Sequence, residues 1–472
     1  MRTAVIQNNS LLNSGRIDPS YHLSESIKLK KQLLGSPYTL TTVGEKSEDV
    51  FLGNIFTRVF VKDAEHGVPY IAASDMTKSS VDSGKFVSKK QAKRLKRLML
   101  DSDWILISCS GTLGNVVYTN DLFKNTFATH DLIRLIPDNK KLLSGFLYAY
   151  LASKYGYTLL TQSGFGGVVK HINSEHVANI PVPLFPESKQ QEIHNLIVES
   201  ANLRVEANRL LEEAKSKLLS YAALPQLTAN NYDYFGARSE GRTASCFTKS
   251  IKNIDTTTIN AFNHSSRIEK TKQQIRDCCQ TIPLEKILND RKIFSTGSFP
   301  RVEVNSENGI MLINQKDIFD TIIKGKKISR RKVKTDSLVE YGEVLIAGVG
   351  TLGESETFCR AIFANEDLQG QLVSGEFIRM KTNEKYLSGY LFAWLNSDYG
   401  FRLIRNTQAG TKLCRPIPRL FLQIPVPILE EAQMIEIDQI VKKTHTLYHL
   451  ANVKENQAIS LVEKEIESWQ QS

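Results

Sequence analysis

The chain has 472 residues, of which 41% are hydrophobic, so it is long enough to bury two or three cores. Its 60 Lys and Arg against 50 Asp and Glu give a net charge of +10, which is compatible with a polyanionic partner but does not establish one. No apolar run approaches the roughly 20 residues of a membrane span and Met1–Ser20 lacks a signal-peptide core, which favours a soluble, cytoplasmic protein with no membrane partner.

In chain order, the first part of the sequence predicts short helices and strands. A short helix is expected at Ser24–Leu34 and an amphipathic helix at Leu142–Leu160. The predicted strands, rich in β-branched and aromatic residues, are Val50–Leu52, Thr57–Val61, Val68–Ala72, Trp104–Ser108, Leu132–Ile136 and Ile180–Leu184. Because helices and strands do not alternate regularly, we expect an α+β domain.

A long amphipathic helix is predicted next, at Glu187–Tyr221. Its apolar seam comprises Ile193, Leu196, Leu203, Ala207, Leu210, Ala214 and Leu218, at intervals of three, four or seven. At 1.5 Å per residue this helix would be about 50 Å long, more than one globular domain usually needs. A helix of this kind is typical of a spacer that pairs with a partner helix along its seam.

Ala222–Thr257 is rich in turn-forming residues and is expected to be a connector. The elements predicted after it repeat the first series: a helix at Arg267–Cys278, strands at Met311–Asn314, Glu343–Ala347, Glu376–Met380 and Gln423–Val426, and a helix at Tyr386–Ile404. A second long amphipathic helix is predicted at Glu430–Trp469. The two long helices are expected to pair as a coiled coil, although each could instead pack only on its own domain.

An internal repeat explains why the two series agree. Leu142–Leu160 and Tyr386–Ile404 share Ser-Gly and Tyr-Gly dipeptides at an offset of 244 residues. The same offset relates the two Ile-Pro-Val-Pro segments at Ile180 and Ile424. Gly111-Thr112-Leu113-Gly114 recurs at Gly350 after 239 residues. Because these matches are collinear, the chain is interpreted as a tandem duplication.

The sequence gives little indication of catalysis. It contains no dinucleotide or phosphate-binding glycine motif, no amino-methylation motif and no metalloprotease motif, so we expect no cofactor. The six cysteines show no CxxC spacing and the nine histidines no ligand spacing, so no metal site is predicted. Pro137-Asp138 with Lys140 and Lys141 faintly resembles a nuclease carboxylate pattern, but a turn after a strand is the simpler interpretation.

Cationic segments occupy equivalent positions in the two copies. Lys89, Lys90, Lys93 and Arg94 precede the first Gly-Thr-Leu-Gly strand, and Arg330, Arg331 and Lys332 precede the second. Equivalent cationic segments favour contacts with the phosphates of DNA. The alternative is a charged face that is only solvated.

Glycine-containing loops that differ between the copies follow the amphipathic helices. Glycine allows close backbone approach, and Gln, Lys and Arg can pair with base edges. The candidate residues in these loops are Gln162, Lys170 and His171 in the first copy and Gln408, Lys412 and Arg415 in the second. The loops differ between the copies while the helices and strands that carry them match, which indicates recognition of two unlike DNA half-sequences. Ordinary surface variability could produce the same differences.

The ordered combination of Ile107-Ser108-x-Ser110-Gly-Thr-Leu-Gly, the Ile-Pro-Val-Pro strand and Gln190-x-x-Ile193 resembles the specificity subunit of type I restriction-modification systems. The resemblance covers nearly the whole chain. It implies a non-catalytic subunit that binds a bipartite, asymmetric site in double-stranded DNA. It also implies two DNA methyltransferase (modification) subunits and motor-nuclease (restriction) subunits as partners.

By this resemblance, the two long helices form an antiparallel coiled coil between two target recognition domains. The expected parts are a first domain at residues 1–186, a central helix at 187–222, a connector at 223–257, a second domain at 258–428 and a C-terminal helix at 429–472. Three alternatives remain: a solitary nuclease or methylase, a protein scaffold that uses the same coiled coil, and a recognition subunit of another methylation or defence assembly.

Overall fold

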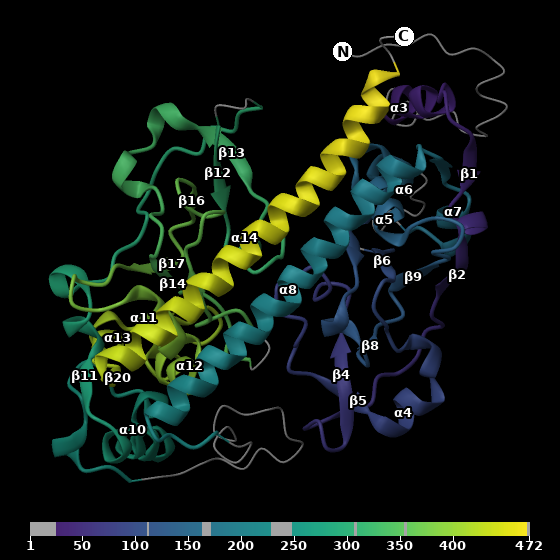
Figure 1. Cartoon of the computed structure of the whole chain (residues 1–472). Coiled ribbons are helices and arrows are strands. Elements are labelled where there is room, and N and C mark those ends of the chain that lie inside the picture. Colours follow the sequence, from purple (N-terminus) through teal and green to yellow (C-terminus); the bar gives the residue numbers. More distant parts are fainter. Residues whose placement is uncertain are drawn as a thin grey trace. The chain divides into compact units, whose positions relative to one another are not determined.

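The computed structural model describes residues 25–110, 113–162, 171–227, 248–305, 309–353 and 356–469 (Figure 1). The chain divides into two compact units. Unit 1 comprises Met1–Val205 with Leu450–Ser472, and unit 2 comprises Glu206–His449. The long helices α8 (Glu187–Tyr221) and α14 (Glu431–Ser468) each contribute one part to each unit. Both helices lie within one residue of the predicted bounds.

The described residues of unit 1 contain two four-stranded sheets, ordered β2-β9-β6-β7 and β3-β5-β4-β8, and the antiparallel pair β1-β10. All neighbouring strands are antiparallel except β4 and β8, which are parallel. The strands are β1 (Leu40–Thr42), β2 (Ser47–Leu52), β3 (Phe60–Val61), β4 (Gly67–Ile71), β5 (Phe86–Ser88), β6 (Ile105–Ser108), β7 (Val116–Tyr118), β8 (Phe127–Ala128), β9 (Leu132–Pro137) and β10 (Pro181–Pro183). The helices before α8 are α3 (Glu25–Leu34), η1 (Gly44–Lys46), α4 (Lys89–Arg94), η2 (Lys96–Leu98), η3 (Asp121–Phe123), α5 (Ser144–Ala152), α6 (Lys154–Gln162) and α7 (Ser174–Ala178).

Unit 2 repeats this topology. The sheet β13-β12-β16 reproduces β5-β4-β8, including its one parallel pair, and β15-β14-β17 reproduces β7-β6-β9. The strands are β11 (Thr281–Pro283), β12 (Gly309–Ile313), β13 (Lys326–Ser329), β14 (Val344–Ala347), β15 (Ala361–Phe363), β16 (Leu372–Val373), β17 (Phe377–Met380), β18 (Gln408–Ala409), β19 (Arg415–Pro416) and β20 (Pro425–Pro427). The helices are η5 (Ile251–Asn253), η6 (Ala261–His264), α10 (Ser266–Cys278), η7 (Leu284–Lys286), η8 (Asn289–Arg291), η9 (Arg330–Lys332), η10 (Thr335–Ser337), α11 (Ser388–Asn396), α12 (Asp398–Asn406) and α13 (Pro418–Leu422). The predicted α+β duplication is confirmed.

The predicted single helices at 142–160 and 386–404 are wrong, because each is two helices. Ser153 is extended between α5 and α6, and its hydroxyl accepts a hydrogen bond from the Gly156 amide (3.3 Å). A Cβ on Gly156 would lie 2.2 Å from the Tyr150 carbonyl oxygen, so only glycine permits this close approach. Ser397 and Gly400 repeat the arrangement between α11 and α12. The repeated Tyr-Gly dipeptide therefore marks a helix break.

The repeated Ser-Gly dipeptide begins α5 in unit 1 and α11 in unit 2. It places α5 against α8 and α11 against α14. The Gly145 amide donates to Nδ1 of His194 in α8 (3.1 Å), and the Gly389 amide donates to Oδ1 of Asp438 in α14 (2.8 Å). A Cβ at either glycine would lie within 3.0 Å of the long helix. The glycines therefore allow α5 and α11 to pack closely against the long helix of their own unit.

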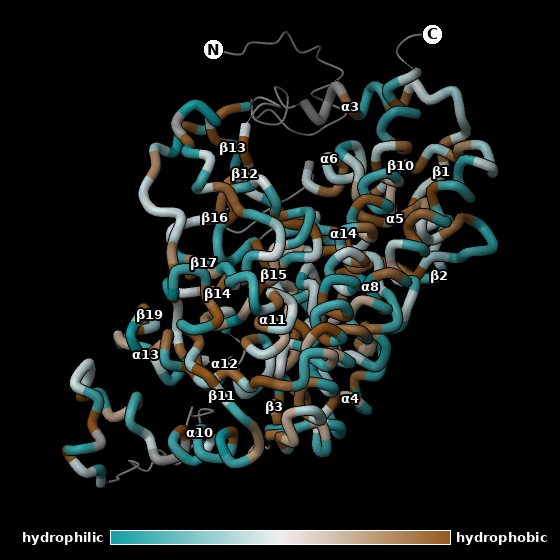
Figure 2. The backbone as a smooth tube through the Cα atoms, turned by 60° about the vertical axis from the view of Figure 1, so that its left-hand side comes forward, coloured by the Kyte–Doolittle hydropathy of each residue, from teal (hydrophilic) through white to brown (hydrophobic). Residues whose placement is uncertain are grey.

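The long helices pair in both units through apolar residues. Figure 2 shows hydrophobic residues alternating with hydrophilic ones along α8 and α14. In unit 1, Ile193, Ile197 and Ala201 of α8 and Ala458, Val462 and Ile466 of α14 belong to one buried cluster. In unit 2, Ala214 and Leu218 of α8 share a buried cluster with Ile437 and Val441 of α14. Lys189 pairs with Glu465, whereas Arg204 pairs with Glu455, so the helices run antiparallel in unit 1. The predicted antiparallel pairing is confirmed.

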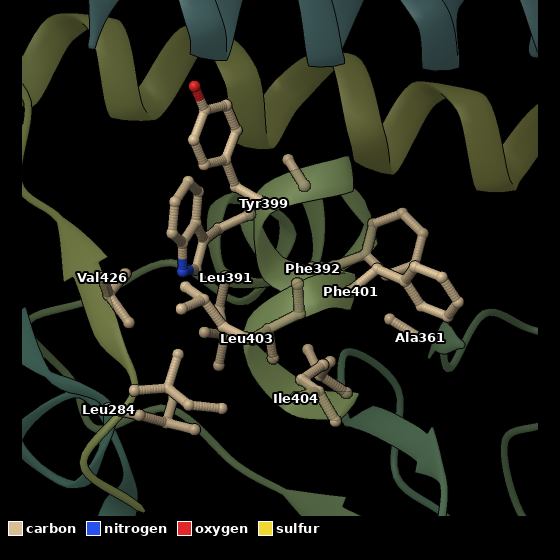
Figure 3. Packing of buried hydrophobic residues seen from close by; sticks show 14 of the residues in the cluster. Leu284, Ala361, Leu391, Phe392, Tyr399, Phe401, Leu403, Ile404 and Val426 are labelled. Carbon is tan, nitrogen blue, oxygen red and sulfur yellow. The ribbon is translucent and has the colours of Figure 1, made fainter. Parts of the chain in front are cut away.

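The largest core of unit 2 lies between α11, α12 and the surrounding strands (Figure 3). Trp394 is fully buried, and its indole N–H donates to the Pro425 carbonyl (3.0 Å). In unit 1, Tyr150 occupies the equivalent position and donates its hydroxyl to the Pro181 carbonyl (2.5 Å). These bonds secure the Ile-Pro-Val-Pro strand in both units, where proline removes its own backbone donor.

Candidate nucleic-acid interface

The cationic segment of unit 1 follows β5 and forms α4 and η2. The Ser88 side chain caps α4 by accepting a hydrogen bond from the Gln91 amide (3.2 Å). All six cationic side chains of this segment are exposed, namely Lys89, Lys90, Lys93, Arg94, Lys96 and Arg97, whereas Gln91, Ala92 and Leu98 are buried. The segment therefore exposes its cationic side chains while Gln91, Ala92 and Leu98 pack inward.

Most of these cations are not neutralised by neighbouring carboxylates. Arg97 pairs with Asp49 (2.5 Å) and covers the Phe51 ring at 4.1 Å. Within the described residues, the other five cations have no carboxylate partner. They are Lys89, Lys90, Lys93, Arg94 and Lys96. A cluster of exposed, uncompensated cations is suited to phosphate contacts.

Buried Gln91 joins this segment to the loop 53–59. Its amide oxygen accepts from the Val59 amide (2.9 Å), and its amide nitrogen donates to the Thr57 carbonyl (2.6 Å). The predicted strand at Thr57–Val61 is therefore correct only for Phe60–Val61. The Gln91 side chain satisfies the Thr57 carbonyl and the Val59 amide, whereas the Val59 carbonyl accepts from the Ser88 amide of β5.

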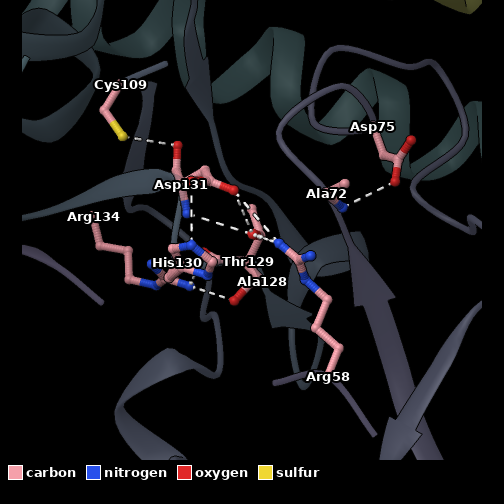
Figure 4. Close-up of polar contacts among 9 residues, drawn as sticks. All are labelled: Arg58, Ala72, Asp75, Cys109, Ala128, Thr129, His130, Asp131 and Arg134. Atoms are coloured by element: carbon pink, nitrogen blue, oxygen red, sulfur yellow. Dashed lines mark hydrogen bonds and ion pairs between the residues drawn. The ribbon is translucent and has the colours of Figure 1, made fainter. Parts of the chain in front are cut away.

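Arg134 of β9 supports the same region, and Figure 4 shows its guanidinium bonded to the Ala128 carbonyl. Its side chain is fully buried and donates to the carbonyls of Leu98 (3.3 Å) and Ala128 (2.8 Å). Burial lowers the Arg134 pKa to about 10. Arg134 therefore connects the end of the cationic segment to the central sheet.

Unit 2 repeats this support around Arg379 of β17. Arg379 donates to the Leu338 carbonyl (2.7 Å) and makes two 2.8 Å hydrogen bonds to Glu343. Both side chains of this ion pair are 1% exposed. The residue of unit 1 that is equivalent to Glu343 is Trp104. The two buried arginines therefore have different hydrogen-bond partners.

The cationic segment of unit 2 covers β13, η9 and the residues around them. Its exposed cations are Lys324, Lys326, Lys327, Arg330, Arg331 and Lys334. Lys326 pairs with Glu303 (2.5 Å). Lys332 lies in η9, but its side chain is outside the described part of the structure. The 3₁₀ turns η9 and η10 follow one another in this segment, where unit 1 has α4 and then η2.

The candidate loop residues differ in how they are placed. In unit 1, Gln162 ends α6 but its side chain is outside the described part, Lys170 is outside the described residues, and His171 is exposed. In unit 2, β18 and β19 form a hairpin in which Lys412 and Arg415 are exposed. Gln408 is only 3% exposed, so we remove it from the candidate DNA-facing residues.

Each candidate loop is attached to the turn after the central strand of its unit. The backbone of His171 bridges to Ser110 in unit 1. In unit 2, Gly350 and Cys414 exchange two backbone hydrogen bonds (2.7 and 3.2 Å). In unit 2 the Gly-Thr-Leu-Gly turn therefore lies beside the variable loop, and in unit 1 the described residue before that turn, Ser110, bridges to His171.

Sequence reasoning missed Gln91, Arg134 and Arg379, although all three hold this candidate interface together. Gln91 lies among lysines and arginines, where it was not distinguishable from a solvated polar residue. Arg134 and Arg379 occupy equivalent strands, and their recurrence at an offset of 245 residues was the available signal.

Two further properties concern the described residues only. No group of three or more His, Cys, Asp or Glu side chains in them is arranged to hold a metal ion. None of their helices combines the length and apolarity that crossing a bilayer requires.

Residues 45–207 match the family described as the type I restriction modification DNA specificity domain. The match runs from η1 into α8. No curated protein sequence matches the chain.

Three solved structures are similar to the chain over most of its length. One is the crystal structure of a type I restriction-modification system S subunit from M. genitalium, with 14% identity, 92% of this chain and 93% of that chain covered, and a TM-score of 0.33. Another belongs to a study of complex assembly and conformational transition of the type I R-M system, with 14% identity, 91% and 98% coverage and a TM-score of 0.27. The third is the crystal structure of the HsdS subunit from Thermoanaerobacter tengcongensis, with 12% identity, 90% and 96% coverage and a TM-score of 0.27.

Proposed function

Because residues 45–207 match the type I restriction modification DNA specificity domain, we propose that the chain is the specificity subunit of a type I restriction-modification complex. Unit 1 and unit 2 each read one half of a split DNA site. The observation that carries this proposal is the family match to the first copy together with the duplicated topology, which gives the second copy the same frame.

The exposed cationic segments support the DNA-binding part of the proposal. Cations follow β5 in unit 1 and β13 in unit 2 at equivalent places, and a buried arginine supports the region in each unit. Phosphate contacts of this kind provide affinity and fix the position of a protein on the duplex without reading sequence. The exposed loop residues His171, Lys412 and Arg415 are the candidates for base contacts.

The long helices are proposed to set the separation of the two half-sites. α8 contains 35 residues and is therefore about 52 Å long. Half-sites one turn of the duplex apart are separated by roughly 34–36 Å, which is within this length. The same helices would offer surfaces on which two modification subunits bind.

The chain is proposed to act without a catalytic site of its own. Methyl transfer would be supplied by the modification subunits, and translocation and cleavage by the restriction subunits. The purified chain alone should neither methylate nor cut DNA, and reproducible methylation or cleavage by the chain alone would contradict this part of the proposal.

Selection of duplexes from a random library tests the proposal. The full chain, co-purified with a modification methyltransferase that binds it, should enrich duplexes that carry two short fixed sequences separated by a constant number of unread bases. Enrichment of a single continuous sequence would contradict the bipartite role. A complex that binds no duplex would favour the alternative, a scaffold subunit of another methylation or defence assembly.

A further inference from the structure

A four-residue segment with the pattern Phe-x-Arg-Val occurs once in each copy, at Phe56–Val59 and Phe299–Val302. Both segments lead into the same backbone contact. The Ser88 amide donates to the Val59 carbonyl (2.9 Å), and the Ser329 amide donates to the Val302 carbonyl (2.8 Å). Ser88 immediately precedes the cationic segment of unit 1, and Ser329 lies within that of unit 2, immediately before Arg330. The repeated segment therefore lies beside each cationic segment.

Packing explains why the phenylalanine recurs. Phe56 is half-buried, and its ring meets Phe127 edge-on at 5.5 Å. Phe299 is half-buried against Ile310, Leu312, Ile328 and Leu372. An aromatic ring at this position anchors the loop in both units.

Packing does not explain why the arginine recurs. Arg58 and Arg301 are both exposed. Arg58 donates through one terminal nitrogen to Oγ1 of Thr129 (3.0 Å) and to Asp131 (3.5 Å), as Figure 4 shows. Among the described residues, its Nε and its other terminal nitrogen have no hydrogen-bond partner. One edge of the guanidinium is thus held in place while other donors remain available.

Arg301 is held differently in unit 2. Its guanidinium lies 5.8 Å from the Phe299 ring centre, and within the described residues it has no carboxylate partner. Arg58 also lies near an aromatic ring, 5.9 Å from the centre of Tyr70, but Tyr70 and Phe299 are not equivalent positions of the two copies and the polar contacts differ. The internal contacts of the two arginines are therefore not the same, whereas a contact with a feature shared by both half-sites would account for an arginine at both positions.

The residues on either side of the repeated segment have diverged. Ile55, which is 88% exposed, precedes the first segment, whereas Ser298 precedes the second. Phe60, 50% exposed, follows the first, whereas Glu303 follows the second. Two unlike half-sites differ in their bases but share the phosphodiester backbone. An arginine present in both copies can contact the phosphodiester backbone, which both half-sites share. The neighbouring residues that differ between the copies can contact the bases, which also differ.

We propose that Arg58 and Arg301 are equivalent phosphate-binding residues, each contacting the DNA backbone at the half-site read by its own unit. The inference rests on the proposed DNA-specificity function. The planar guanidinium can donate two parallel hydrogen bonds to one phosphate, which fixes orientation as well as adding charge. The neighbouring cationic segment supplies further, less directional contacts.

The test measures DNA affinity against salt concentration for the full chain co-purified with its methyltransferase. The probes are a duplex with the selected target sequence and a scrambled duplex of equal length. Arg58→Ala and Arg301→Ala should each reduce the slope of log affinity against log salt by about 0.9, the value for one phosphate contact. Each should weaken both duplexes by the same factor and leave the ratio between them unchanged.

Matched variants separate phosphate binding from loss of charge and from loss of folding. Lys141→Ala removes one charge beyond the far end of β9, roughly 20 Å along the strand from Asp131, and should leave the slope unchanged. Arg58→Lys keeps the charge and should keep the slope. Arg301→Ala breaks no hydrogen bond or ion pair within the described residues, so it tests the inference even if Arg58→Ala unfolds.

Three results would overturn the inference. Unchanged slopes in both alanine variants, with a wild-type complex that binds, would reject phosphate binding and leave the proposed function standing. Weaker binding of the target duplex alone would assign the arginines to base reading. Failure of the wild-type complex to bind either duplex would reject the proposed function itself.

Discussion

Arg204 of α8 and Glu455 of α14 form an ion pair of 2.5 Å in unit 1, with side chains only 16% and 5% exposed. Arg204 also donates to the Asn452 side chain (2.9 Å), and Tyr148 of α5 donates its hydroxyl to Glu455. Burial, with a smaller contribution from Glu455, raises the Tyr148 pKa well above its ordinary value. A buried polar cluster within the apolar seam of two amphipathic helices favours one register, because another alignment would leave buried charges unpaired.

Replacing Glu455 by Gln should destabilise unit 1 strongly, because Arg204 would keep its buried charge without an anionic partner. The expected loss is about 3 kcal/mol or more in free energy of unfolding, measured by urea denaturation. Replacing both residues by apolar ones (Arg204→Met with Glu455→Leu) should recover most of the loss.

Glu199 and Lys454 provide the control on the same two helices. Their ion pair is 3.0 Å long, with side chains 50% and 32% exposed. Glu199→Gln should therefore cost less than about 1 kcal/mol. Equal costs for Glu199→Gln and Glu455→Gln would show that burial does not distinguish the two pairs.

Gln91→Ala should loosen the loop 53–59 without removing any charge. Two backbone groups of that loop, the Val59 amide and the Thr57 carbonyl, would lose their partner, at a cost of about 1–3 kcal/mol. Hydrogen exchange at the Val59 amide should become faster, and DNA affinity should fall. Lys93→Ala, on the exposed face of α4, should lower affinity while leaving that exchange rate unchanged. Slow exchange at Val59 in the Gln91 variant would contradict this account.

His445 makes unit 2 sensitive to acid. The ring is surrounded by Phe363 (4.9 Å), Phe392 (5.1 Å) and Tyr448 (5.8 Å), and burial lowers its pKa from 6.5 to about 3. Above pH 6.5 the imidazole is neutral in both the folded and unfolded states, so it has no effect on the pH dependence. Between pH 6.5 and 3 the unfolded state binds a proton that the folded state excludes, so stability falls as the pH falls.

Thermal unfolding from pH 7 to 4 measures this effect. Wild type should lose stability more steeply than His445→Leu over that range, and the difference should disappear above pH 7. His449→Gln is a comparison at a half-exposed histidine, whose Nδ1 donates to the Asp367 carboxylate at 2.6 Å. Parallel curves for wild type and His445→Leu would contradict the burial effect.

Shortening both long helices by one heptad should change the spacing between half-sites. Seven residues removed from each helix, around Val205 and Leu450, preserve the phase of the apolar seam and shorten each helix by about 10 Å. The recognised site should lose about three unread base pairs while its two half-sequences stay the same. An unchanged spacing would contradict the spacer role. Removing the heptad from α8 alone should misalign the seam and prevent assembly.

The sequence predicted the long helices, the duplication and most central strands, because periodicity and repeated motifs are local signals. It predicted one helix over Leu142–Leu160, since the apolar periodicity continues through Ser153 and only the Gly156 contact reveals the break. Residues that act over long sequence distances, such as Gln91 and Arg134, carried no local signal. Gln408 had the chemistry of a base reader, but hairpin packing buries it.

The central claim is tested most directly by mapping DNA methylation in a host that lacks its own methyltransferases and expresses this chain with the neighbouring methylase. The account predicts one split, asymmetric motif that is methylated only when both proteins are present. A chain whose hairpin residues Lys412 and Arg415 are both replaced by Ala should alter or lose recognition of one half of that motif and leave the other half unchanged. Absence of any new methylated motif, despite a purified and assembled complex, would contradict the claim.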